Sequence, residues 1–219
     1  RALGKMWLQT ERDLIRFNPT SDFWLDTSAF TGLLSQYRDV KRQGGEGLPF
    51  LETATALYRE DFLSGFSVSD SAGFEEWQFF QTESLRREFA WALEKLVEEY
   101  EQRRQYALAL PIARRWLTLD TLNETAHCSL MCLYAEMDDR AAAIRQYEAC
   151  VQILKTELDV PPQPETKALY EQILRGEFRE LDRVDAGNGD VAAEAVDDQG
   201  AKGEPDSLLE VFRLGERAE

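Results

Sequence analysis

The stretch LVEEYEQRRQYALALPIARRWLTL at residues 96–119 is followed by LMCLYAEMDDRAAAIRQYEACVQI at residues 130–153. The two align at an offset of 34 residues, and every apolar position considered stays apolar. The aligned pairs are Leu96 with Leu130, Val97 with Met131, Tyr100 with Tyr134, Ala109 with Ala143, Ala113 with Tyr147, Leu117 with Val151, and Leu119 with Ile153. Such self-similarity at a fixed period predicts two copies of one supersecondary unit.

A period of 34 residues is that of the tetratricopeptide repeat, which consists of a helix, a tight turn and an antiparallel helix. Ala109 and Ala143 are small enough to let two helices approach closely, and Tyr100 and Tyr134 would fill the space beside them. One helix pair cannot bury its apolar face alone, so neighbouring pairs are required. The repeat therefore predicts an all-α fold of antiparallel helix pairs wound into a right-handed superhelix.

Helical spacing of apolar residues extends this prediction in both directions. Helices are expected at residues 27–37, 48–58 and 73–102 before the second repeat unit. The third is long for a globular protein, so we expect a kink or partial break within it. A last helix is expected at residues 165–175, after a proline-rich segment that ends the preceding helix.

Only the beginning of the chain has a strand pattern. MWLQTERDLIRFNP, residues 6–19, predicts two short strands joined by a charged turn. An isolated hairpin is marginally stable at best in water. We therefore expect it to persist only if Trp7, Ile15 or Phe17 packs near Trp24 and Phe30.

Composition limits the class of protein. The chain has 219 residues, 43% of them hydrophobic and 30% charged, and a formal net charge of −16. That balance is typical of a globular protein, and the acidity argues against broad DNA binding, which depends on Lys and Arg. No apolar run reaches the roughly 18 residues of a membrane span, so no membrane association and a cytoplasmic location are expected. Because the sequence begins with Arg1, we expect it to be a piece of a longer protein.

Residues 177–219 differ from the rest of the chain, with 13 acidic against 5 basic side chains and few large apolar residues before the end. They predict an acidic, disordered linker or tail. The terminal LLEVFRLGERAE, residues 208–219, would form either a short docking helix or the start of a further domain.

No arrangement of residues predicts catalysis, a metal site or a cofactor. His127, Cys128 and Cys132 lack the second ligand pair that a zinc site needs, so core packing by reduced thiols and a buried-edge His is expected. Asp61 is expected to cap a turn or pair with an arginine, while Phe62, Leu63 and Phe66 plug the core. The chain has one histidine and no nucleophile-elbow or phosphate-loop motif, so no enzymatic activity is expected.

Two groups of residues are candidates for partner binding. The first is a set of arginine pairs that could form a basic stripe: Arg86, Arg87, Arg103, Arg104, Arg114 and Arg115. Alternatively they form a solvated face with the i,i+4 pairs Glu83–Arg87 and Glu99–Arg103. The second group is aromatic, and burial between the N-terminal helices and the repeats is favoured over exposure to a partner. Its members are Trp77, Phe79, Phe80, Phe89 and Trp91.

Three stretches together resemble one family. They are LYREDFLSGF at 57–66, the segment 114–154 that contains the second repeat unit, and TELDVPPQPETKALYEQI at 156–173. They are similar to the bacterial transcriptional activation domain, the helical half of Streptomyces antibiotic regulatory protein-type regulators. The resemblance covers residues 22–175. The family usually has glycine where this chain has Glu60, Arg104, Asp138 and Asp159, so the turns at Glu60 and Arg104 are expected to be more open.

The resemblance implies a division of the chain. In that family a winged-helix DNA-binding domain precedes the helical domain and ends in a hairpin wing. Residues 1–20 would then be the remnant of that domain, residues 21–176 the helical activation domain, and residues 177–219 the tail. DNA would be bound only through the missing N-terminal domain.

The resemblance also implies a function. The helical domain would be a regulatory module that contacts RNA polymerase or its sigma factor, mediates dimerisation, or receives a signal from a downstream domain. Two alternatives stay open from the sequence. One is a general tetratricopeptide scaffold for protein–protein contacts, and the other is a helical domain that senses a small ligand or nucleotide.

Overall fold

The computed structural model describes residues 8–11, 14–18, 23–68, 71–176 and 212–213. These residues fall into two compact units, one containing three short strands and the other containing the helices.

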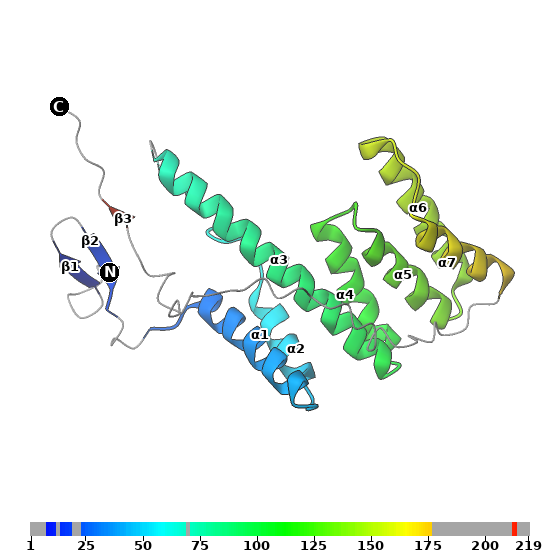
Figure 1. Ribbon diagram of the computed structural model, residues 1–219, viewed down its shortest axis with the longest axis horizontal. Coiled ribbons are helices and arrows are strands. Elements are labelled where there is room, and N and C mark those ends of the chain that lie inside the picture. Colours follow the sequence, from blue (N-terminus) through cyan, green and yellow to red (C-terminus); the bar gives the residue numbers. More distant parts are fainter. Residues whose placement is uncertain (1–7, 12–13, 19–22, 69–70, 177–211, 214–219) are drawn as a thin grey trace, which may run out of the picture. The chain divides into compact units, whose positions relative to one another are not determined.

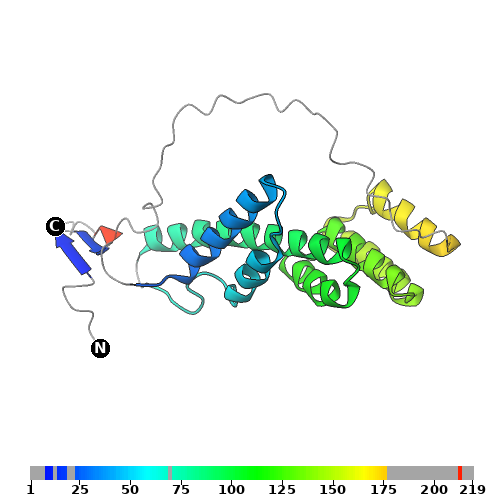
Figure 2. The same ribbon diagram turned by 90° about the horizontal axis from the view of Figure 1, so that it is seen from below.

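The described part of the helical unit contains seven helices in which each packs against the next along the chain (Figures 1 and 2). They are α1 (Asp26–Arg42), α2 (Leu48–Leu57), α3 (Ala72–Gln102), α4 (Tyr106–Leu119), α5 (Glu124–Glu136), α6 (Arg140–Leu158) and α7 (Pro164–Arg175). The α7 helix also contacts α5, as a cap on the last pair. This confirms the tetratricopeptide-like, all-helical fold, whereas the handedness of the superhelix stays a prediction.

The 34-residue repeat corresponds to two helix pairs, the C-terminal half of α3 with α4 and α5 with α6. Ala109 and Ala143 are both fully buried, as expected for positions where two helices approach closely. Tyr100 is buried, and its hydroxyl donates to Glu52 Oε1 at 2.7 Å. Tyr134 is only partly buried, and its hydroxyl accepts a hydrogen bond from Arg114 Nη2 at 2.9 Å.

The turns inside the two pairs have the same geometry. Arg104 and Asp138 occupy equivalent positions, with left-handed φ values of +54° and +59°. The N–H of the next residue donates to the carbonyl of Tyr100 in one turn and of Tyr134 in the other, at 2.8 Å in both. The expectation of a more open turn at Arg104 is therefore wrong, because the helix-end hydrogen bonds and the packed pair determine the conformation.

The other unusual turn lies between α2 and α3. Glu60 does not have a positive φ, whereas Leu63 and Gly65 do, at +53° and +76°. The left-handed position is thus displaced three residues from the one the family pattern suggests.

The α3 helix is continuous over 31 residues, so the expected partial break is wrong, whereas the expected kink stays a prediction. Different helices cover its apolar face along its length: α2 packs against one part and α4 against the next. The buried residues include Phe89, Leu93, Leu96 and Val97. Because helical stability in proteins comes mainly from packing an apolar face, this long interface supports an unusually long helix.

The strand unit contains β1 (Leu8–Glu11) and β2 (Leu14–Phe17), which pair antiparallel with Leu8 opposite Phe17. A third strand, β3 (Phe212–Arg213), pairs with the other edge of β2. The two predicted strands therefore do not form an isolated pair, and of the two alternatives for residues 208–219 the docking helix is wrong at residues 212–213, which form a strand. The rest of the predicted acidic tail and the side chain of Trp7 lie outside the described residues.

Trp24 and Phe30, the expected supports of the hairpin, have different environments. Trp24 is 67% exposed, whereas Phe30 is buried in the helical core. The Phe30 ring lies edge-on to Tyr58 at 5.8 Å and to Phe89 at 6.4 Å between centroids. Phe30 therefore joins α1 to the connection after α2 and to α3.

Candidate functional site

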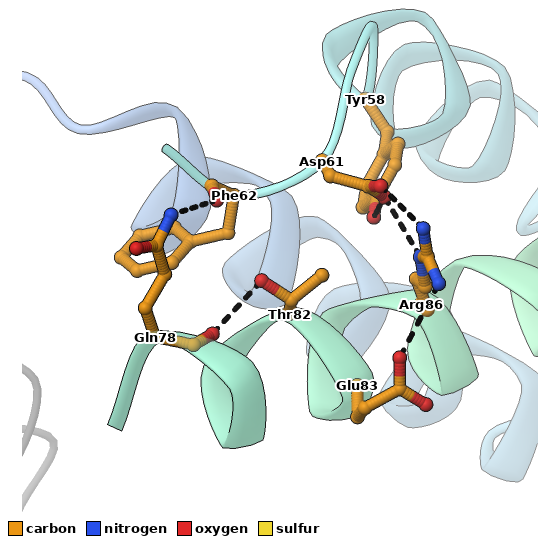
Figure 3. Close-up of polar contacts among 7 residues, drawn as sticks. All are labelled: Tyr58, Asp61, Phe62, Gln78, Thr82, Glu83 and Arg86. Carbon is orange, nitrogen blue, oxygen red and sulfur yellow. Dashed lines mark hydrogen bonds and ion pairs between the residues drawn. The ribbon is translucent and has the colours of Figure 1, made fainter. Parts of the chain in front are cut away.

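An ion-pair network fastens the α2–α3 connection to α3 (Figure 3). Arg86 Nε donates to Asp61 Oδ1 at 2.9 Å, and a second guanidinium nitrogen contacts Asp61 Oδ2. Glu83 Oε1 lies 3.3 Å from Arg86 Nη1, and the Tyr58 hydroxyl donates to Asp61 Oδ1 at 3.2 Å. The hydrogen bonds from Arg86 lower the pKa of Asp61, whereas burial and the neighbouring Asp61 charge raise the pKa of Tyr58 to about 12. The prediction that Asp61 pairs with an arginine is confirmed.

The side-chain amide of Gln78 also holds the α2–α3 connection, by contacting backbone carbonyl oxygens of that loop. Its Nε2 lies 3.5, 3.2 and 3.4 Å from the carbonyl oxygens of Phe62, Leu63 and Phe66. The Phe62 ring packs edge-on against Trp77, with centroids 5.5 Å apart (Figure 3 shows Phe62 and Gln78). However, Leu63 is 38% and Phe66 53% exposed, so the expectation that they plug the core is wrong. The Phe66 ring contacts Phe74 edge-on, with centroids 5.7 Å apart, and stays half exposed.

Phe79 and Phe80 lie near the N-terminal end of α3. That end of the helix extends past α1 and α2 (Figures 1 and 2). Each ring is 59% exposed, and the two rings contact each other edge-on at 5.7 Å. The favoured prediction of burial is therefore wrong for this pair. It is confirmed for Phe89, which is 1% exposed and stacks on Tyr58 at 4.1 Å.

The exposed phenylalanines are framed by charge. Glu76 and Glu83 stand three or four residues from Phe80 on either side, and Arg87 follows at seven. Residues with this spacing share one helix face. We call the residues Glu76, Phe79, Phe80, Glu83 and Arg87 the α3 face. It combines an apolar centre with a largely acidic border.

The six predicted partner-binding arginines have different environments. Arg86 is held by Asp61, and Arg103 lies 3.5 Å from the buried Glu99 Oε2, which confirms the predicted Glu99–Arg103 pair. Glu83 pairs with Arg86 and not with Arg87 as expected. Arg87 and Arg104 are exposed, on α3 and in the turn after it.

The other two arginines form contacts between helices. The Arg114 guanidinium lies 5.8 Å from the Tyr134 ring centroid. Arg115 Nη1 donates to the carbonyl of Thr55 at 3.0 Å, and its Nη2 contacts the carbonyl of Tyr58. Its guanidinium also lies 4.5 Å over the Phe89 ring. Arg115 thus connects α4 to the end of α2, a contact that spans 60 residues of sequence and has no local signal.

His127 is a packing residue with both ring nitrogens bonded. Gln146 Nε2 donates to Nδ1 at 2.7 Å, and Nε2 lies 3.1 Å from the Thr121 carbonyl, which can only accept. These partners specify the neutral imidazole protonated at Nε2. Burial lowers the pKa of His127 and also raises that of the Cys128 thiol. Among the described residues, no cluster of three metal-ligating side chains occurs.

A solvent-open cavity of about 440 Å³ lies beside the Asp61–Arg86 pair. The α2–α3 connection, α3 and α4 all contribute to its wall. The lining residues are Tyr58, Arg59, Glu60, Asp61, Ser64, Arg86, Phe89, Arg115, Thr118 and Leu119. Sequence reasoning identified the Asp61 segment as polar but not the approach of Arg115.

Comparison with known proteins agrees with this geometry. The family model of the bacterial transcriptional activator domain matches residues 25–174, which include all seven described helices up to the last turn of α7. No curated protein matches the chain. None of the described helices is long and apolar enough to cross a membrane. The matched family consists of transcription-regulator domains, not enzymes. The chain belongs to the bacterial transcriptional activator domain family.

Proposed function

We propose that this chain is the non-enzymatic regulatory module of a cytoplasmic transcription regulator and that it binds a protein partner through the α3 face. The observation that carries the proposal is the exposure of Phe79 and Phe80, 59% each, on a well-packed helical domain. Large exposed apolar groups with a polar border are characteristic of interaction sites.

The energetics favour a covered face. A phenylalanine buries roughly 150–250 Å² when fully packed, so the exposed part of each ring is on the order of 100 Å². At about 25 cal/mol per Å², burying both rings contributes about 5 kcal/mol of gross binding energy. Such a contribution is typical of a binding hot spot formed by two aromatic anchors.

The border indicates the chemistry of the partner. Glu76 and Glu83 flank the two phenylalanines, and Glu75 adds a third carboxylate in the same turns of α3. A complementary surface carries apolar residues flanked by Lys or Arg, as on an amphipathic basic helix. Within a transcription regulator, we propose that RNA polymerase or its sigma factor supplies this surface. Self-association and docking of a downstream signal domain are the competing occupants.

The arginines have a smaller role in this proposal. Arg87 belongs to the α3 face and would pair with an acidic residue of the partner, and Arg104 would make a rim contact at most. Arg86, Arg103, Arg114 and Arg115 hold intramolecular contacts, with Asp61, Glu99, Tyr134 and the carbonyls at the end of α2. We propose that this helical surface does not recognise DNA.

The test is binding of purified RNA polymerase, as core and as holoenzyme, to the immobilised full 219-residue chain. The variant is F79S/F80S, and the matched control is L108S/L158S, which removes two apolar side chains that are each 52% exposed elsewhere. We expect the first variant to weaken binding at least tenfold and the control to change it less than twofold. Equal binding by all three chains refutes the α3 face as the contact.

Two further measurements separate the alternatives. If F79S/F80S converts a dimer to a monomer in light scattering, the face belongs to self-association and not to the polymerase. A gel shift with the chain alone should give no sequence-specific DNA binding at sub-micromolar concentration in physiological salt. Such binding would contradict the proposal that the helical surface does not recognise DNA.

A further inference from the structure

The cavity beside the Asp61–Arg86 pair differs from the α3 face in both shape and chemistry. Its volume of about 440 Å³ is within the range of roughly 300–1,000 Å³ in which small-molecule sites fall. Three arginines and two acidic residues contribute to its wall. In a chain of net charge −16, a wall with excess positive charge is a local feature and not a consequence of composition.

Arg115 is the central residue of this wall. It is half-buried, and within the described part of the chain its contacts are two carbonyl oxygens and the face of Phe89, with no carboxylate in ion-pair distance. Burial lowers the pKa of its guanidinium. A partly buried cation without an anion is energetically costly, and a bound anion would relieve that cost. Two of the five guanidinium N–H groups serve the carbonyls, so others remain available as donors.

Some of the other charged groups of the wall are neutralised by an ion pair, and others have no ion-pair partner among the described residues. Asp61 is neutralised by Arg86. Arg59 is exposed and has no carboxylate partner among the residues that the structure describes. Glu60 is also exposed, where solvent screens its charge. The two guanidinium charges left unpaired are therefore those of Arg59 and Arg115, and the Ser64 hydroxyl lines the same space.

We propose that this cavity binds a small organic phosphate monoester, with its phosphate against Arg115 and Arg59. At neutral pH such a phosphate carries nearly two negative charges, which match the two unpaired guanidinium groups. It presents three acceptor oxygens, one more than a carboxylate, and arginine forks fit phosphate oxygens in bidentate geometry. The volume exceeds what a phosphate alone fills, and the side chain of Leu119 provides apolar lining for the organic part.

Binding at this position would act on the fold. Arg115 already connects α4 to the last residues of α2, and Asp61 connects the following loop to α3. A phosphate that engages Arg115 and Arg59 would add a bridge between the same loop and α4. The ligand would thus stabilise the junction between the N-terminal helices and the repeat pairs, independently of any partner on the α3 face.

The experiment is isothermal titration of the full chain with four probes: AMP, glucose 6-phosphate, inorganic phosphate and adenosine. We expect at least one of the two esters to bind with a dissociation constant below about 1 mM, and adenosine not to bind. Binding should raise the melting temperature, because a ligand specific for the native state stabilises it. If neither ester binds, or if inorganic phosphate binds as tightly as both esters, the proposal fails.

Variants locate the site. R59Q changes an exposed side chain without a structural contact in the described residues, so it should fold normally and weaken ester binding about tenfold. R115Q should abolish binding, with far-UV circular dichroism as the check of its fold. The matched control is R145Q, which removes an exposed arginine of α6 outside the cavity. Equal weakening by R59Q and R145Q, or none by R59Q, overturns the assignment.

Discussion

Replacing Phe89 by alanine is the sharpest test of how this domain is held together. The Phe89 ring is 1% exposed and contacts residues from three other segments. It stacks on Tyr58 at 4.1 Å, lies 6.4 Å from Phe30, and accepts the Arg115 guanidinium at 4.5 Å. Phe89 therefore joins α1, the end of α2, α3 and α4 at one point.

The magnitude follows from this burial. Removing a fully buried phenylalanine costs about 3–5 kcal/mol, since the transfer energy is lost and a cavity remains. For a domain of this size each kcal/mol shifts the melting temperature by roughly 2–4 °C. We expect F89A to unfold about 6–20 °C below the wild type. F89L, which retains apolar volume but loses the ring contacts, should cost about 1–2 kcal/mol.

The same helix supplies the matched control. Phe79 precedes Phe89 by ten residues and is 59% exposed, so F79A should change the free energy of unfolding by about 0.5 kcal/mol or less. Stability is measured by urea unfolding followed by circular dichroism, with the slope compared among variants to check that the transition is the same. A loss below about 1.5 kcal/mol for F89A, or equal losses for F79A and F89A, would refute the reasoning.

Three further perturbations test individual features. Burial keeps His127 neutral and lowers its pKa, so its contribution to the stability of the folded chain is complete above about pH 6.5 and is lost as the pH falls below that value. The urea midpoints at pH 7.5 and 5.5 should therefore differ more for the wild type than for H127Q. R104G should raise stability by about 1 kcal/mol in thermal unfolding, because glycine adopts the left-handed φ of +54° without steric cost, and a loss of stability would contradict this. Glu99 is 3% exposed, and its carboxylate lies 2.6 Å from a lysine nitrogen and 3.5 Å from an arginine nitrogen. E99A should therefore lower the free energy of unfolding, measured in urea, by about 2 kcal/mol, whereas D39A, which removes a surface ion pair, should lower it by about 0.5 kcal/mol. Equal effects of the last two changes would show that burial does not strengthen the Glu99 contacts.

Several features of the fold could be predicted from sequence because their signals are local. The 34-residue repeat, the buried alanines at positions 109 and 143, and the proline-started last helix follow from spacing and residue type alone. The family assignment also follows from ordered stretches of sequence, and the family model matches residues 25–174.

Other features depended on contacts between distant segments. The α3 helix is continuous over 31 residues because other helices pack along it. An expectation based on average helix length contains no information about these packing partners. Phe79 and Phe80 have the same residue type as Phe89, yet each is 59% exposed whereas Phe89 is 1% exposed. Similarly, Arg104 adopts the geometry of Asp138 because the two helix pairs impose the same hydrogen bonds on both turns.

The candidate sites show the same division. The sequence by itself determined that the chain forms helical repeats, that Asp61 caps a turn or pairs with an arginine, and that His127 belongs to packing. Only the tertiary structure decided which arginine Asp61 takes, and that Arg115, 57 residues from Tyr58, reaches its carbonyl and leaves a guanidinium facing a cavity. The physical reason is that burial and ion pairing depend on which surfaces pack together. Such packing brings together residues that are far apart in the sequence, at separations that follow no helical or repeat period.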